Sequence, residues 1–320
     1  MENDYDRAPS PPPPETPMWF RNLRAWRLDS PWKLDADALD AQLGEAAFAP
    51  CAPGQAETLG WEAPVGEDPD RLVREVAGRQ LLRARMQERI LPQAAVTELL
   101  PERLAELEAR EGGPVRGARR RELAESIRAE LLPKALLKST RQWLLIDRQT
   151  GLVLVDSATP ARGESLLSLL RDSLGSLPVR PLAFARPLDG TLTAWVQGGD
   201  LPAGFALGQW CDLEHPQDTS NKVRFRGQPL DEEEVTATLA RGLRVTALEL
   251  CWDAGAEEPL RCVLSEDGSV RRLRLPSAEG TPADDESEAA RLDADLALLG
   301  LTLERFFGAL FPALGGLATD

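Results

Sequence analysis

The sequence predicts an α+β fold, in which antiparallel strands and packed helices follow one another without a regular β-α-β alternation. Three observations support this class. Short apolar runs occur as pairs joined by a turn, as at 142–146 and 152–155, which predicts buried hairpins. Amphipathic stretches such as 164–174 carry leucine at helical spacing. The Asp-Gly dipeptide at 267–268 lies between two apolar runs and is typical of a tight hairpin turn.

The N-terminal part divides into an extension and the first half of a domain. Residues 1–17 hold six prolines and almost no large apolar side chain, which predicts a disordered, Pro-rich extension before Met18. The alternation in 20–28 predicts a strand with its basic residues outward. A helix over 35–48, a Gly- and Pro-rich loop over 50–69 and a strand over 79–86 follow.

The segment between Pro92 and Pro133 is predicted to be helical, with a break at Gly112-Gly113-Pro114. Two helices joined by such a turn form a helical hairpin that can project from the body. Its second arm carries one apolar stripe, made of Leu123, Ile127 and Leu131.

The C-terminal part mixes further strands and helices. Beyond the apolar run 191–196 and a loop, we expect strands at 222–226, 244–252 and 260–264 and after Gly268, helices at 231–241 and 293–311, and an acidic loop at 278–288. The predicted division is an extension (1–17), a central domain in two parts (18–92 and 136–180), the helical hairpin or finger (93–135) and a C-terminal base domain (181–320).

Composition excludes several classes of protein. No run approaches the roughly 18 apolar residues of a membrane span, and no signal peptide precedes the folded part, so we expect a cytoplasmic protein without a membrane partner. The four cysteines form no Cys-x-x-Cys pair, and His215 is the single histidine, which excludes zinc knuckles and multi-histidine metal sites within one chain. No phosphate-binding glycine loop is present. We therefore expect no cofactor, no metal and no catalytic residue.

Charge is distributed unevenly along an acidic chain. The net charge is −15, yet residues 71–148 hold seventeen Lys and Arg against eleven Asp and Glu, whereas residues 253–295 hold five against twelve. The Debye length is only about 8 Å at physiological salt, so local charge governs local contacts. A basic, phosphate-binding surface is therefore compatible with an overall acidic protein.

The basic side chains gather in a few places along the chain. Guanidinium groups suit phosphate because their planar fork donates two hydrogen bonds at once, and alternate residues of a strand such as 222–226 line one face. The candidate DNA-binding residues are Arg110, Arg116, Arg119, Arg120, Arg121, Lys134, Lys138, Lys222, Arg224, Arg226, Arg272 and Arg274. No base-reading helix is evident, so binding is expected to reach the duplex backbone without sequence preference.

Three other interpretations stay open from the residues alone. The basic runs can be solvated faces with internal ion pairs. The helical hairpin can serve as a protein–protein scaffold. Carboxylates near the C-terminus, in the stretch 284–295, can hold metal ions in a nuclease; they are Asp284, Asp285, Glu286, Glu288, Asp293 and Asp295.

Several stretches, in order and spacing, resemble the bacterial recombination-associated RdgC family over Met18 to about Leu314. They are Met18–Leu23, Leu152–Asp156, Leu169–Arg171, Ser173–Val179, Leu192–Val196 and Asp267–Leu273. The resemblance implies a ring-shaped homodimer with a basic hole that accommodates duplex DNA. It also implies a non-enzymatic, nucleoid-associated antagonist of the RecA recombinase. By position it places Leu136 and Leu137 at the subunit contact, where the family often has an aromatic in place of Leu136.

Overall fold

The computed structural model describes residues 20–66, 68–253, 255, 258–275 and 287–318. The predicted extension at 1–17 and the acidic stretch at 278–286 lie outside these residues. Within them the chain is α+β, with a twelve-stranded antiparallel sheet and seven α-helices, which confirms the predicted class. The elements are β1 (Leu23–Leu28), α1 (Ala36–Leu43), η1 (Gly44–Ala46), β2 (Glu57–Glu62), β3 (Val73–Val76), β4 (Arg79–Ile90), α2 (Gln93–Glu111), α3 (Ala118–Leu131), η2 (Leu132–Lys134), β5 (Leu136–Asp147), β6 (Leu152–Asp156), α4 (Pro160–Leu174), β7 (Val179–Pro181), α5 (Leu188–Val196), β8 (Phe205–His215), β9 (Asp218–Arg226), α6 (Glu233–Leu239), β10 (Arg244–Trp252), β11 (Leu260–Ser265), β12 (Val270–Arg274) and α7 (Glu288–Ala313).

One sheet runs through the whole molecule. Its strand order is β2-β4-β5-β6-β1-β12-β11-β10-β8-β9, with β3 paired to β4 and β7 paired to β1. Strand β1 joins the N-terminal strands to the C-terminal ones, because it pairs with both β6 and β12. The sheet is therefore continuous across the domain limit predicted at 180/181, which falls inside β7.

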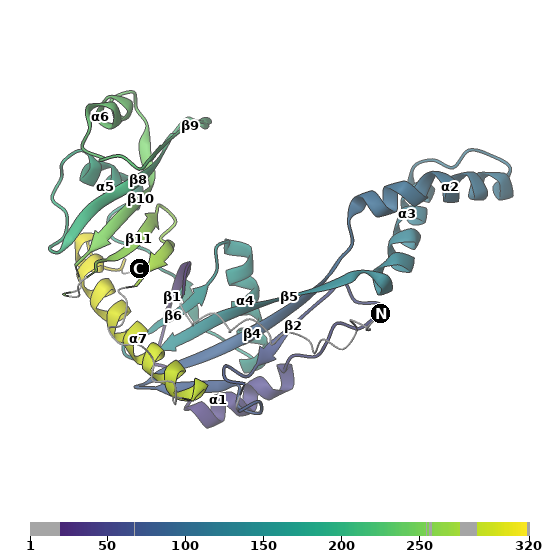
Figure 1. Cartoon of the computed structure of the whole chain (residues 1–320), viewed down its shortest axis with the longest axis horizontal. Helices are drawn as coiled ribbons and strands as arrows, with labels where there is room; N and C mark the ends of the chain where they lie inside the picture. The colour runs from purple at the N-terminus through teal and green to yellow at the C-terminus, as the bar shows by residue number, and fades with distance from the viewer. Residues whose placement is uncertain (1–19, 67, 254, 256–257, 276–286, 319–320) are drawn as a thin grey trace, which may run out of the picture.

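The molecule is a crescent with two arms (Figure 1). Strands β4 and β5, of twelve residues each, run out of the body and carry α2 and α3 at their far ends. We call residues 93–134 the helical arm. The other arm, residues 182–275, contains β8 to β12 with α5 and α6, and we call it the C-terminal arm. The β8–β9 hairpin leans from it toward the open side of the crescent.

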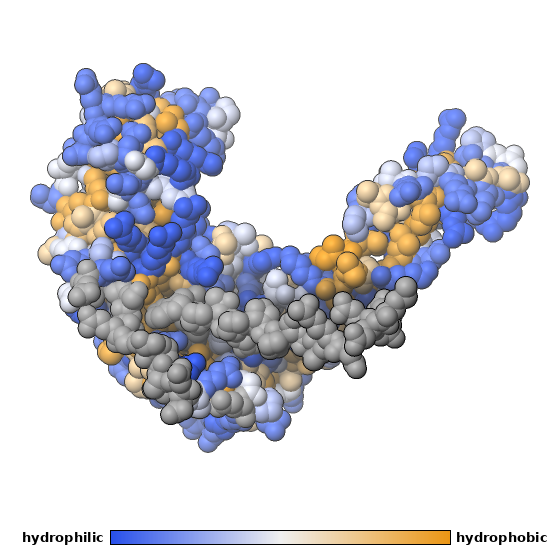
Figure 2. All heavy atoms as spheres, in the orientation of Figure 1, coloured by the Kyte–Doolittle hydropathy of each residue, from blue (hydrophilic) through white to orange (hydrophobic). Residues whose placement is uncertain are grey.

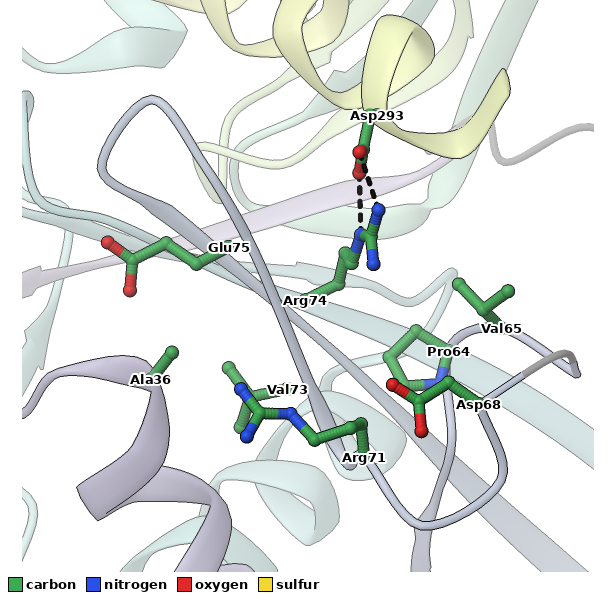
Figure 3. Close-up of a pocket in the computed structure, with 9 residues that line it drawn as sticks. All are labelled: Ala36, Pro64, Val65, Asp68, Arg71, Val73, Arg74, Glu75 and Asp293. Carbon is green, nitrogen blue, oxygen red and sulfur yellow. Dashed lines mark hydrogen bonds and ion pairs between the residues drawn. The ribbon is translucent and has the colours of Figure 1, made fainter. Parts of the chain in front are cut away.

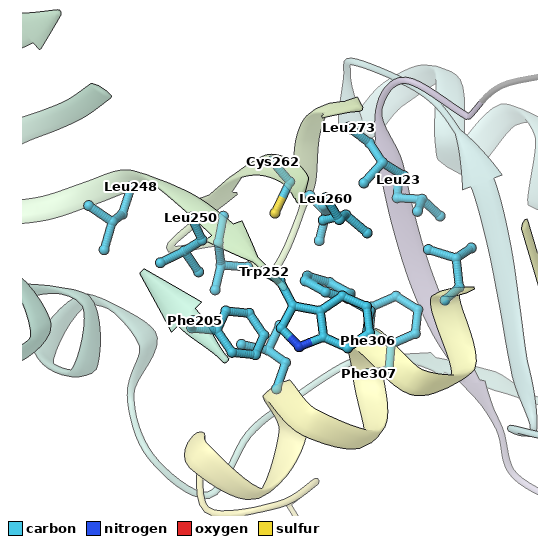
Figure 4. Close-up of a cluster of buried hydrophobic side chains, with 14 of the residues drawn as sticks. Leu23, Phe205, Leu248, Leu250, Trp252, Leu260, Cys262, Leu273, Phe306 and Phe307 are labelled. Carbon is cyan, nitrogen blue, oxygen red and sulfur yellow. The ribbon is translucent and has the colours of Figure 1, made fainter. Parts of the chain in front are cut away.

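Two hydrophobic clusters lie on opposite faces of the sheet, as the two-residue alternation of strands requires. On β5, Leu145 belongs to the first cluster, whereas Leu144 and Ile146 belong to the second, which also holds side chains of α1 and α4. The first cluster packs α7 against the sheet, with Trp252, Phe306 and Phe307 in contact (Figure 4).

Helix α7 is the one described helix that is long and apolar enough to cross a membrane, with a mean hydropathy of 1.4 over its most apolar stretch. Its apolar side belongs to the first cluster: Leu296, Leu299 and Phe306 are fully buried there. The hydropathy of α7 is therefore that of a core helix. It begins at Glu288, five residues before the predicted start.

The helical arm has little core of its own. Helix α2 ends at Gly112 in the left-handed region (φ 72°), and α3 begins after Gly117 (φ 59°), so the break predicted at 112–114 is confirmed. Of the predicted stripe, Ile127 is buried, whereas Leu123 and Leu131 are only half-buried. The buried apolar side chains of this arm are Val96, Leu107, Val115 and Ile127.

Several predictions about single elements were wrong or differ in length. The strands predicted at 79–86 and 222–226 are longer, and the helix predicted at 35–48 is shorter. The predicted loop at 50–69 contains β2, because Trp61 is buried in the second cluster and β2 pairs along its whole length with β4. The region predicted as loop before 222 contains the long strand β8, whose alternation is interrupted by two register shifts. The strand predicted at 142–146 starts already at Leu136. The basic residues of β1 are half-buried rather than outward, because β1 is a central strand.

Candidate nucleic-acid interface

The tip of the helical arm brings together five of the candidate arginines. The turn between α2 and α3 places Arg110 at the end of one helix beside Arg119, Arg120 and Arg121 at the start of the next. Arg119 is ion-paired, at 2.9 Å to Glu111 and 3.1 Å to Glu122, and these hydrogen bonds raise the pKa of its guanidinium. Within the described part of the chain we find no side-chain partner for Arg110, Arg116, Arg120 or Arg121, all of which are exposed.

The local backbone makes this concentration of positive charge unfavourable in the isolated chain. A helix N-terminus carries roughly half a positive charge, so acids are favoured there and cations are not. The first turn of α3 has no acid, and its N-cap residue, Gly117, supplies no side-chain hydrogen bond. Arg119, Arg120 and Arg121 therefore lie in the first turn of α3, where the helix dipole favours an anion.

The root of the helical arm carries two lysines and an apolar patch. Lys134 is exposed, and Lys138 lies 3.5 Å from Glu88 on the neighbouring strand. Beside them, three large apolar side chains are exposed to solvent: Leu136 by 79%, Leu137 by 47% and Ile90 by 43%. Ile90 and Leu136 are direct partners across β4 and β5. Ile90 and Leu136 share a face, whereas Leu137 points to the other face, so we call Ile90 and Leu136 the root patch. Figure 2 shows hydrophobic surface in this region.

Strand β9 presents three candidate residues on one face, as its alternation predicts. Lys222, Arg224 and Arg226 are exposed, while Phe225 points into the core. Two of the three have acidic partners on β8: Lys222 lies 2.7 Å from Glu214, and Arg226 lies 3.3 Å from Asp212. This face is therefore less positive than its sequence suggests.

Arg272 of β12 meets Arg226 of β9 on a single indole ring. The guanidinium carbons of Arg226 and Arg272 lie 3.3 and 3.5 Å from the ring centre of Trp210. Arg274 is exposed on the same strand as Arg272. However, β12 has a register shift here and Arg272 has a φ of 52°, so the simple alternation that we predicted for Arg272 and Arg274 does not hold.

Sequence reasoning missed a basic cluster on β4 and β5. Glu62 is surrounded by three arginines, at 3.1 Å to Arg83, 2.6 Å to Arg141 and 4.0 Å to Arg85. The signal was present in the sequence, because Arg83 and Arg85 stand at alternate positions of a strand and therefore share a face. Only the pairing of β4 with β5 adds Arg141, through its register with Arg85.

The carboxylates considered for a metal site are not gathered into one in the described residues. Asp293 accepts two hydrogen bonds from Arg74, at 2.6 and 2.5 Å, in a pocket of about 270 Å³ (Figure 3). Arg71 at the same pocket is bound to Asp37 at 2.8 Å. In the part of the chain that the structure describes, no group of three His, Cys, Asp or Glu can hold a metal ion. Asp284, Asp285 and Glu286 lie outside that part.

The thiols and the histidine serve structure. All four cysteines are free, and burial raises the pKa of Cys211 to about 12, which leaves its thiol protonated and unreactive. His215 lies at the end of β8, where its Nδ1 accepts a hydrogen bond of 3.2 Å from the backbone of Gln217. These contacts are those of core packing and of a turn.

Comparison with known proteins agrees with the resemblance seen in the sequence. A family model described as "Putative exonuclease, RdgC" matches residues 18–317. The chain belongs to the RdgC family. A relative named "Recombination-associated protein RdgC" from Aeromonas hydrophila is 36% identical over 302 residues, which cover 93% of this chain and 98% of the relative. The protein of the same name from Pseudomonas aeruginosa is 39% identical over 303 residues, with the same coverage.

The match covers nearly all of the folded chain and begins at residue 18, where we predicted that the folded sequence starts. The predicted family is therefore confirmed, and with it an association with recombination. The family description contains the words "Putative exonuclease", whereas the names of the relatives mention no enzyme activity.

Proposed function

We propose that this protein is a non-enzymatic clamp that encircles duplex DNA as a homodimer and restrains RecA in recombination. The observation that carries the proposal is the group of arginines at the tip of the helical arm. Arg116, Arg120 and Arg121 are exposed and lack acidic partners among the described residues, in a chain with a net charge of −15. Positive charge placed at a helix N-terminus destabilises the free protein, and a phosphate backbone removes that cost.

The shape of the molecule supports encirclement by two copies. Each crescent has basic residues on both arms, so two crescents facing one another would enclose a basic space (Figure 1). The acidic remainder of the chain would lie outside. Because a closed ring must open an interface before it dissociates, a modest set of phosphate contacts would hold it on DNA. A DNA-bound protein of this kind belongs in the cytoplasm, with the nucleoid.

The root patch supports a contact between subunits. Isolated apolar side chains on a surface are common, but Leu136 is 79% exposed and has Ile90 directly beside it. In the proposed dimer this patch meets a second copy. Replacing Leu136 with Asp should then release monomers of 35.0 kDa in light scattering. Leu301→Asp, on an exposed position of α7, is the matched control and should leave the dimer intact; an unchanged mass of the Leu136 variant would contradict the assignment.

DNA binding is tested with labelled random-sequence duplexes in a filter-binding or anisotropy assay. If about six phosphates are neutralised per ring, the logarithm of the affinity should fall with the logarithm of salt concentration at a slope near −5. Different duplex sequences should bind equally. An affinity that does not change with salt, or no binding at low salt, would contradict the proposal and would favour the protein–protein scaffold.

A second candidate is a metal-dependent nuclease, because the family description contains the word exonuclease. The acids of the stretch 284–295 are the residues to test, although Asp293 is held by Arg74. Incubating end-labelled duplex with the protein and Mg²⁺ separates the two candidates. The clamp leaves the DNA intact, whereas release of nucleotides that is lost in Asp284→Asn/Asp285→Asn would establish the nuclease.

A further inference from the structure

The stack of Arg226, Trp210 and Arg272 joins strands that are not neighbours. Trp210 on β8 is the direct cross-strand partner of Arg226 on β9. Arg272 lies on β12, and two strands, β10 and β11, separate it from β8 in the sheet. The side chains of Arg272 and Trp210 must therefore both extend over the intervening strands to meet.

Small side chains on the intervening strands make room for this contact. Ala247 on β10 and Val263 on β11 are 1% and 2% exposed, yet neither belongs to the hydrophobic clusters on the two faces of the sheet. They face away from α7, because their neighbours Leu248 and Leu264 belong to the first cluster. Trp210 faces the same side of the sheet, because its neighbour Cys211 on β8 belongs to the first cluster.

The backbone of Arg272 is strained for an L-residue. Its φ of 52° lies in the left-handed region, where glycine is the favoured residue. The bulge that produces this conformation allows both Val270 and Leu273 to enter the core, although they are three residues apart. An arginine at a position that suits glycine indicates that its side chain has a use there.

The charges of the stack are not balanced by acids. Asp212 accepts hydrogen bonds from the indole Nε1 of Trp210 at 2.8 Å and from Arg226 at 3.3 Å. Among the described residues we find no acid that forms an ion pair with Arg272 or with Arg224. Asp212 lies opposite Arg224 in the pairing of β8 with β9. One carboxylate therefore faces three guanidinium groups. The nearby acids Glu214 and Glu249 are engaged by Lys222 and by the backbone N–H of Gln209.

Stacking on the indole leaves N–H groups at the edges of the guanidinium groups able to donate hydrogen bonds. A guanidinium group that lies flat on an indole uses its face for the cation–π contact, and its N–H fork remains free in the ring plane. Two such cations on opposite faces of one ring repel each other, and an anion between their edges relieves the repulsion. A phosphodiester group fits because it accepts two parallel hydrogen bonds from an arginine.

We propose that Trp210 is a positioning residue that holds Arg226 and Arg272 as a preformed site for the phosphodiester groups of a nucleic-acid backbone. This site deepens the proposed function and rests on it. It assigns a role to an aromatic residue that makes no contact with the bases, since both faces of its ring are occupied. It also explains how two basic segments distant in the sequence, at 226 and 272, act together.

The test compares full-length variants in their affinity for a labelled random-sequence duplex over a range of salt concentrations. Trp210→Leu should weaken binding roughly three- to tenfold, because the arginines lose their support, whereas Trp210→Phe keeps an aromatic face and should restore most of the affinity. Arg272→Gly should reduce the salt slope by about one. The same variant relieves the strained φ, so it should unfold at a temperature no lower than the wild type.

The matched control is Arg305→Ala. Arg305 is an exposed residue of α7 near Trp252, on the other face of the sheet, and its replacement should leave DNA binding unchanged. Asp212→Asn should tighten binding, because it removes the acid of the stack. A folded Trp210→Leu variant with wild-type affinity and slope would overturn the site while leaving the clamp intact. Equal losses in Arg305→Ala and Arg272→Gly would also overturn it. A wild-type protein that does not bind duplex would instead overturn the proposed function, and this site with it.

Discussion

The two arms of the crescent present their arginines in opposite ways. At the tip of the helical arm, Arg116, Arg120 and Arg121 project into solvent without acidic partners in the described part of the chain. On the C-terminal arm, Arg226 and Arg244 are ion-paired and Arg226 and Arg272 stack on Trp210. The helical arm carries its exposed arginines on a segment with few buried side chains. In the C-terminal arm, ion pairs and stacking hold the arginines in place. This difference indicates that the capacity of a surface to bind phosphate depends less on its number of arginines than on the acidic or aromatic side chains that contact them.

We expect the largest effect from substitutions at the tip of the helical arm. Replacing Arg116, Arg120 and Arg121 together with Gln should weaken duplex binding roughly 100-fold at physiological salt and reduce the salt slope by about three, because three phosphate contacts are lost. The measurement is duplex affinity by anisotropy. The paired triple Arg71→Gln, Arg103→Gln and Arg148→Gln removes the same charge from residues with acidic partners and should have a small effect. Equal losses in both triples would show that only net charge matters.

A second prediction concerns the stability of the body that carries both arms. A Cβ at Gly300 of α7 would lie 2.2 Å from Cδ of Arg79, which is buried and cannot move because Asp147 and Glu304 hold it. Gly300→Ala should therefore lower the free energy of unfolding by about 2–3 kcal/mol, measured by urea denaturation. Gly308→Ala in the same helix meets no atom within 4 Å and should instead stabilise by up to about 1 kcal/mol. Destabilisation by both changes would contradict the close approach at Gly300.

A third prediction concerns the pH dependence of stability in the packed core of the C-terminal arm. Burial raises the pKa of Cys211 from 9.0 to about 12, and it also raises the pKa of Cys262. Above pH 9 the unfolded chain releases these protons and the folded chain retains them. The contribution of the two thiols to the free energy of unfolding is therefore fully present below pH 9 and is lost as pH rises toward 12. Each thiol should contribute a loss of about 1.4 kcal/mol per pH unit in that range.

The corresponding measurement is the urea midpoint between pH 8.5 and 10.5. Cys211→Ala should lose stability with pH less steeply than the wild type, because one of the buried thiols with a raised pKa is gone. Identical slopes in the two proteins would contradict the burial of Cys211.

Much of the fold was predictable from local pattern. The break in the helical arm followed from Gly112 and Pro114, and the hairpin after β11 from Asp267 and Gly268, because these residues favour turns whatever surrounds them. Strand β2 was missed because it is held by pairing with β4, and nothing in its own six residues indicates that partner. The outer part of β5 was missed because its side chains are mostly exposed and do not form the apolar run of a buried strand.

The candidate site was predictable only in part, because local sequence gives charge but not partners. The arginine run at 119–121 lies exposed at the tip of the helical arm, and its binding to DNA stays a prediction. The run at 222–226 did not reveal that Lys222 and Arg226 have acidic partners on β8. The contact of Arg272 with Trp210 depends on a bulge and on two intervening strands, and no spacing in the sequence predicts it.

Enclosure of the duplex is tested most directly by comparing release from closed circular and linear DNA of one sequence. The protein is loaded at low salt and then challenged with salt high enough to remove the phosphate contacts. The clamp should slide off the ends of the linear duplex and remain on the circle, and Leu136→Asp should abolish the difference. Equal release of the wild type from circle and line would contradict a ring closed around DNA.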